Sequence, residues 1–158
     1  MKQRKKSEHL WTIGAILIFI VLVLVGYKVK DSSSHHYSSM ATVDTSCDLQ
    51  QGKCTTVLAN GARVSLLLTP HTIRVLHPLL LKVVTGGVNV STVNIDFRGI
   101  GMDMGYNSVT LSKEKKDTFV GKTRLPACIH AEMKWEARVL LSTDQGVMMV
   151  PFQFSSRK

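Results

Sequence analysis

The fold is indicated most clearly by the segment Met133-Lys134-Trp135-Glu136-Ala137-Arg138-Val139-Leu140-Leu141. Apolar and polar side chains alternate along most of it, which is typical of a β-strand with one buried face and one face in water. Asp144-Gln145-Gly146 then supplies a turn, and apolar residues recur at every second position from Met148 to Phe154. The sequence therefore predicts a β-hairpin here, with Trp135 packed in the core.

The same period of two recurs upstream of this hairpin. It is clear from Val93 to Phe97 and from Val64 to Leu68, and turn signals such as Asn60-Gly61 separate the apolar segments. Shorter or less regular strands are expected near 54–58, 77–84, 106–112 and 117–123. Seven or eight short strands without a convincing amphipathic helix predict an all-β fold, an immunoglobulin-like antiparallel β-sandwich.

The N-terminal part of the chain has a different character. From Leu10 to Tyr27 there are 18 consecutive uncharged residues, which as a helix would extend about 27 Å and span the apolar core of a bilayer. Four basic residues precede this run and two follow it, so the N-terminus is expected in the cytoplasm. A cleaved signal peptide is the alternative, but the run ends without a small-x-small cleavage site, which favours an uncleaved signal anchor.

These features predict four regions: a basic cytoplasmic tail (1–9), a transmembrane signal anchor (10–27), a flexible Ser-rich linker (28–46) and an extracytoplasmic β-domain (47–158). The expected location is the bacterial inner membrane, with a single pass in contact with lipid and the C-terminal domain in the periplasm. The formal net charge is +9, but six of the 20 basic residues lie among the first 30. The rest is only mildly basic, so we expect no nucleic-acid binding.

The three cysteines all follow the predicted span. In an oxidising compartment they are expected to pair, which leaves one over. Cys47 and Cys54 flank a turn-like hexapeptide and could close a small hairpin, whereas Cys54 with Cys128 is the alternative, because sequence alone does not define the connectivity.

The segment Gly101-Met102-Asp103-Met104-Gly105 holds the best candidate ligands. In an extended segment Met102 and Met104 point to the same side, and the glycines allow backbone conformations that other residues resist. Cu(I) prefers soft sulfur donors, and a thioether cannot form a disulfide. We therefore predict a copper site, Cu(I) favoured, with Met102 and Met104 as principal donors and His130 or Cys128 completing it.

Strand parity limits which residues can join this site. A strand running unbroken from Cys128 would turn Cys128 and His130 to the face opposite Met133. The three could then bind one ion only if Pro126 or a bulge shifted the register. Met133 is accordingly interpreted as core packing rather than as a ligand.

Five short motifs between Asn94 and Ser142 follow one another in the order Met104-Gly105, Val109-Thr110-Leu111, Phe119-Val120-Gly121, Leu125-Pro126 and Met133-Lys134-Trp135-Glu136-Ala137. This order resembles the periplasmic FixH/YtkA-like domains over about a third of the chain. The resemblance implies a membrane-anchored β-sandwich associated with copper handling or with the assembly of haem-copper respiratory oxidases.

The predicted function is therefore a membrane-tethered periplasmic copper-binding or oxidase-assembly factor, whose partner is a membrane complex such as a haem-copper oxidase. The alternative is an immunoglobulin-like interaction module or accessory subunit that binds no metal and docks onto a larger membrane complex through the loop from Gly99 to Gly105. We expect no enzyme activity, because the sequence holds no recognisable catalytic triad motif, paired catalytic carboxylates, phosphate-binding loop or Cys-x-x-Cys.

Overall fold

The computed structural model describes residues 11, 14–24, 37–42, 47–127 and 129–158. The chain divides into two compact units, residues 1–35 and residues 36–158. In the first unit, residues 14–24 are helical. No helix within the described residues is both long enough and apolar enough to cross a membrane. The predicted span, 10–27, extends past the described residues at both ends.

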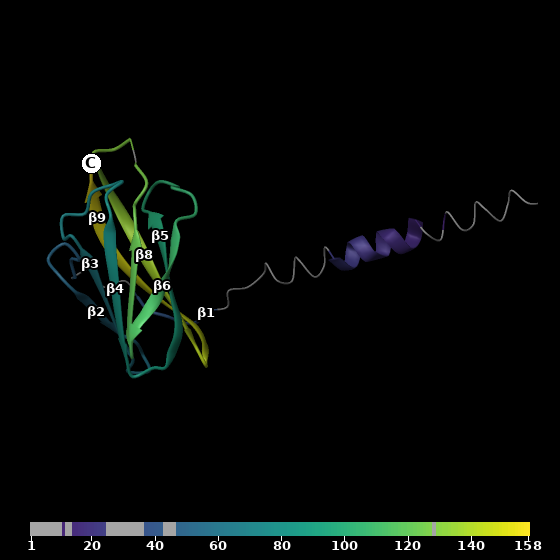
Figure 1. Cartoon of the computed structure of the whole chain (residues 1–158), viewed down its shortest axis with the longest axis horizontal. Helices are drawn as coiled ribbons and strands as arrows, with labels where there is room; N and C mark the ends of the chain where they lie inside the picture. The colour runs from purple at the N-terminus through teal and green to yellow at the C-terminus, as the bar shows by residue number, and fades with distance from the viewer. Residues whose placement is uncertain (1–10, 12–13, 25–36, 43–46, 128) are drawn as a thin grey trace, which may run out of the picture. The chain divides into compact units, whose positions relative to one another are not determined.

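The described part of the second unit is all-β, as predicted (Figure 1). It contains nine strands, which form one sheet in the order β1-β9-β8-β5-β6-β7-β4-β3-β2. In chain order the strands are β1 (Tyr37–Met40), β2 (Cys54–Val57), β3 (Arg63–Thr69), β4 (Leu79–Gly86), β5 (Val90–Gly99), β6 (Ser108–Lys115), β7 (Thr118–Thr123), β8 (Glu132–Thr143) and β9 (Gly146–Arg157).

Strand β6 divides the sheet into two layers. Its first half, from Ser108 to Leu111, pairs with β5, whereas its second half, from Ser112 to Lys115, pairs with β7. The strands β1, β9, β8 and β5 therefore belong to one layer, and β7, β4, β3 and β2 to the other. The result is a sandwich-like or barrel-like arrangement with the core between the layers.

The predicted hairpin is the longest pairing in the sheet. β8 and β9 pair without interruption from Glu132 opposite Arg157 to the turn at Gly146. Trp135 lies fully buried in the core, as predicted, and its Nε1 donates a hydrogen bond to Ser156 Oγ at 2.8 Å. This bond satisfies the one polar group of the indole, so burying the ring leaves no unpaired donor.

The start of the β-domain differs from the prediction. β1 lies inside the segment 28–46 that was expected to be a linker, and it pairs with β9 in parallel, so the sheet is not wholly antiparallel. Ala41 N extends this contact by donating to Met149 O at 3.1 Å. Strand pairing uses backbone groups, which a Ser-rich composition does not reveal. Residues 28–36 and 43–46 of the predicted linker lie outside the described residues.

The disulfide between Cys47 and Cys54 is confirmed, which excludes the alternative pairing of Cys54 with Cys128. The loop that it closes packs onto the domain, because Leu49 is fully buried and Gln50 Nε2 donates to Ser155 O at 2.8 Å. Cys128 is not among the described residues.

Candidate functional site

The candidate ligands lie at one end of the domain. The antiparallel pairings bring the ends of β3, β5 and β7 together, so the loops 70–78, 100–107 and 124–131 all emerge there. The disulfide-closed loop before β2 lies at the same end, as does the C-terminus of β9 (Figure 1). This convergence brings residues from distant parts of the sequence within reach of one site.

The loop between β5 and β6 (100–107), called the methionine loop below, has a backbone conformation set by two glycines and one aspartate. Gly101 and Gly105 both have positive φ, 85° and 70°, which glycine adopts without strain. Asp103 Oδ1 accepts a hydrogen bond from Gly105 N at 2.9 Å and closes a tight turn between them. Met102 and Met104, on either side of Asp103, are half-buried and pack against the core. The glycines therefore set the direction in which the two thioethers leave the loop.

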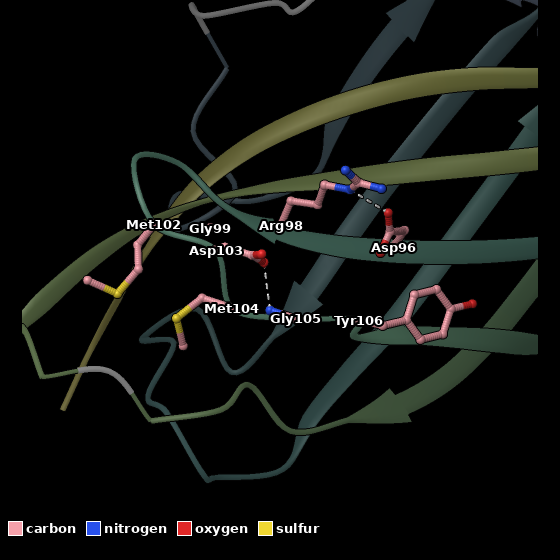
Figure 2. A pocket seen from close by; sticks show the side chains of 8 residues that line it. All are labelled: Asp96, Arg98, Gly99, Met102, Asp103, Met104, Gly105 and Tyr106. Atoms are coloured by element: carbon pink, nitrogen blue, oxygen red, sulfur yellow. Dashed lines mark hydrogen bonds and ion pairs between the residues drawn. The ribbon is translucent and has the colours of Figure 1, made fainter.

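Met102 and Met104 line the same open pocket, of about 560 Å³. Figure 2 shows both sulfur atoms directed toward the same end of this pocket. Asp96 and Arg98, which form an ion pair at 2.9 Å, lie toward its other end, and the exposed Tyr106 ring points away from the sulfurs (Figure 2). The two thioethers thus point to the same side, as expected, and the ion pair lies away from them.

His130 lies on the other side of Met102. It is exposed, and it lines a smaller pocket of about 160 Å³ together with Met102 and Met133. β8 begins only at Glu132, so the unbroken strand that would separate His130 from Met133 does not exist. A backbone hydrogen bond from Lys158 N to Ala131 O, at 3.1 Å, joins this preceding segment to the C-terminus.

Of the four predicted ligands, the structure thus brings Met102 and Met104 to one pocket and Met102 and His130 to the next. The place of Cys128 is not described. Within the described residues, no three His, Cys, Asp or Glu side chains cluster in a way that could hold a metal ion. The donor set that the described residues offer to a soft cation is made of thioethers with an imidazole beside them.

Met133 lies close to the methionine loop, which sequence parity does not indicate. Gly99 ends β5, and a Cβ atom at this position would overlap Met133 Cε and lie 2.9 Å from Met104 Cγ. The same Cβ would lie 2.7 Å from Met102 O. The side chains of Met104 and Met133 and the backbone of Met102 therefore come against one glycine. A glycine at the end of a strand, three residues before Met102 of the Met-x-Met motif, is a sequence signal for such a close approach.

No family model matches the sequence, and no curated protein matches it. Among solved structures, the chain is similar to the crystal structure of an engineered protein, with 14% sequence identity and a TM-score of 0.46. The match covers 63% of this chain and 21% of the engineered one, so the chain spans about a fifth of that protein's length.

Proposed function

We propose that this protein is a membrane-tethered, extracytoplasmic Cu(I)-binding protein that delivers copper to a respiratory oxidase or assists its assembly. The observation that carries the proposal is the pair Met102 and Met104, whose thioethers leave a glycine-bounded loop in the same direction and line one open pocket (Figure 2). Thioethers are neutral, soft ligands that select Cu(I) over the harder divalent cations.

The exposure of this site fits transfer of a metal ion rather than permanent storage. Met102 and Met104 are half-buried, and the pocket that they line is open to solvent. A partner can therefore bring its own ligands to the ion while the thioethers still hold it. Such ligand exchange makes and breaks only coordination bonds, so the proposed function needs no catalytic residue.

The apolar helix supports the proposed tether. Its large apolar side chains from Ile16 to Leu24 are all exposed, by between 45% and 68%. A helix that is apolar all round is stable in lipid and not in water. With the basic residues before it, this helix is the centre of the proposed single-pass anchor, 10–27, in the bacterial inner membrane. We further propose that the two-layer β-domain is of the immunoglobulin-like type and lies in the periplasm.

Cu(I) titration of the full chain in mild detergent, with a competing chelator and under reducing conditions, tests the metal site. The double variant Met102→Leu/Met104→Leu keeps the size of both side chains but removes both sulfurs. We expect its Cu(I) affinity to fall on the order of 100-fold, or about 2.8 kcal/mol. The matched control is Met148→Leu/Met149→Leu, which alters two buried methionines of β9. Unchanged affinity in the loop variant would contradict the proposal.

A second candidate function, an interaction module without metal, is favoured by exposed apolar side chains at the same end of the domain. Ile100, Tyr106 and Ile129 are 43%, 88% and 81% exposed. Exposed apolar groups around a site are typical of surfaces that dock onto a partner.

Affinity purification of the full chain from solubilised membranes, with and without a copper chelator, separates the two functions. An interaction module should retain the same partners in both conditions and lose them in Tyr106→Ser/Ile129→Ser. Recovery of the chain without a partner in both conditions would contradict the interaction module.

A further inference from the structure

The contact at Gly99 joins the methionine loop to the scaffold. Gly99 pairs with Trp135 across β5 and β8, so its position is set by the sheet and not by the loop. The space that a side chain would fill at residue 99 is occupied by Met133 Cε, Met104 Cγ and Met102 O. Since all three lie within 3 Å of one point, Met104 and Met133 are in direct reach of each other.

Met133 contacts both the core of the domain and the methionine loop. As the second residue of β8 it is 6% exposed and packs with the core cluster, as parity predicted. It nevertheless also lines the smaller pocket together with Met102 and His130. A methionine side chain is long and unbranched, so its base can pack in the core while its sulfur reaches the edge.

Building on the proposed function, we propose that Met133 is a third thioether ligand, which completes a three-sulfur site for Cu(I) with Met102 and Met104. Cu(I) has a filled d shell and imposes no strong geometric preference, and soft sulfur ligands suit it. Two ligands, Met102 and Met104, come from the methionine loop, and the third, Met133, is held in place by β8. The scaffold thus presents one sulfur before the metal arrives, which reduces the ordering that binding requires.

Gly99 is the residue that permits this arrangement. Any side chain at this position would overlap Met133 Cε and the Met102 carbonyl oxygen. Gly99→Ala should therefore push Met133 and the loop apart and weaken metal binding, although residue 99 has no donor atom of its own. Gly86→Ala is the matched control, because its added Cβ would meet no described atom within 4 Å.

Ag(I), which is soft and redox-inert, is the probe for the direct test. The full chain contains seven methionines, and ¹³C-labelling of their methyl groups reports each one separately by NMR in detergent. On addition of one equivalent of Ag(I), the methyl signals of Met102, Met104 and Met133 should shift together. Those of Met148 and Met149, which are buried in β9, should stay in place.

A variant gives an independent measurement. Met133→Leu retains an apolar side chain of similar volume in the core but removes the sulfur. We expect its Ag(I) affinity to fall about tenfold or more, whereas Met148→Leu should bind as the wild type does. Circular dichroism of each metal-free variant checks that the β-fold is kept, and the wild-type methyl signals provide the test even if a variant does not fold.

The outcomes separate this inference from the proposed function. If the Met102 and Met104 signals shift but Met133 does not, and Met133→Leu binds as tightly as the wild type, the third ligand is wrong and the two-thioether site stands. If the wild type binds neither Ag(I) nor Cu(I), the proposed function is wrong and the third ligand with it. If the signals of Met102, Met104 and Met133 shift together and Met133→Leu binds more weakly, the proposed function and the third ligand are both supported.

Discussion

Methionines occur in two contrasting regions of this domain. In β9, Met148 and Met149 lie opposite Leu141 and Leu140 of β8 and are almost completely buried. In the loop after β5, Met102 and Met104 are half-buried and line an open pocket. The side chain is the same, so the difference comes from its surroundings: β9 lies between β1 and β8 in the sheet and its methionines are enclosed, whereas the glycine-bounded loop leaves its thioethers beside an open pocket.

The largest effect is expected from damage to the scaffold that supports both regions. Trp135→Ala removes a fully buried indole and leaves Ser156 Oγ without that partner. We expect the free energy of unfolding to fall by about 3–5 kcal/mol, measured by urea denaturation followed by far-UV circular dichroism. Ser156→Ala keeps the ring but leaves its buried N–H unpaired, and should cost about 1–2 kcal/mol. Equal losses in the two variants would contradict the assignment of Trp135 as the central core residue.

Opening the disulfide should act more strongly on the loop from Ile100 to Asn107 than on the two methionines of β9. Cys47 and Cys54 are separated by seven positions, for which the loss of loop closure predicts about 2 kcal/mol of destabilisation in Cys47→Ser/Cys54→Ser. Cys47 lines a pocket together with Ile100, the residue that follows β5. The Met102 and Met104 methyl signals should therefore shift more than those of the β9 methionines. A larger shift at Met148 and Met149 would contradict this.

Gly105→Ala tests the loop backbone alone. Gly105 has a φ of 70°, and an added Cβ would meet no described atom within 4 Å. The cost is therefore conformational, about 1 kcal/mol, and thermal unfolding should show it. Gly86→Ala adds a methyl group in similarly open space without a positive φ and should be neutral or slightly stabilising. A neutral Gly105→Ala would show that the loop does not depend on this conformation.

The smallest effect is expected for a loop methionine, compared with a methionine of β9. Met148→Leu alters close packing in the core and should cost up to about 1.5 kcal/mol. Met104→Leu, which is half-buried, should stay within about 0.5 kcal/mol, measured by the same unfolding experiment. If the loop variant were the less stable one, the contrast between the two regions would be reversed.

The strands that sequence predicts are those whose side chains build the core. β3, β5, β8 and β9 each place apolar residues at every second position, and these positions are buried. β1 was not predicted, because its pairing with β9 depends on backbone contacts across the fold. The start of β8 at Glu132 was also not predictable, since a hydrogen bond from the C-terminal Lys158 joins the segment before it.

Prediction of the candidate site from sequence has the same limit, because it misses contacts between distant parts of the chain. Met102 and Met104 lie two residues apart between glycines, so their common direction follows from local geometry. The position of Met133 does not follow from local geometry, because it depends on the end of β5 at Gly99 lying beside the start of β8. Period-two parity correctly put Met133 on the core side, but parity does not say how near the end of the strand lies to a loop.

The outer edge of β9 is covered at several points by different parts of the chain. β1 pairs with the start of β9 at Val147–Met149. Pro151, two residues after Met149, has no backbone N–H that could donate to another strand. Farther along, Ser155 O accepts from Gln50, and Arg157 pairs through its backbone with Ile73 and Val75. An uncovered apolar strand can add strands from other molecules and start aggregation. Copies of this domain that are crowded together therefore meet an edge whose backbone is already paired at its start and near its end.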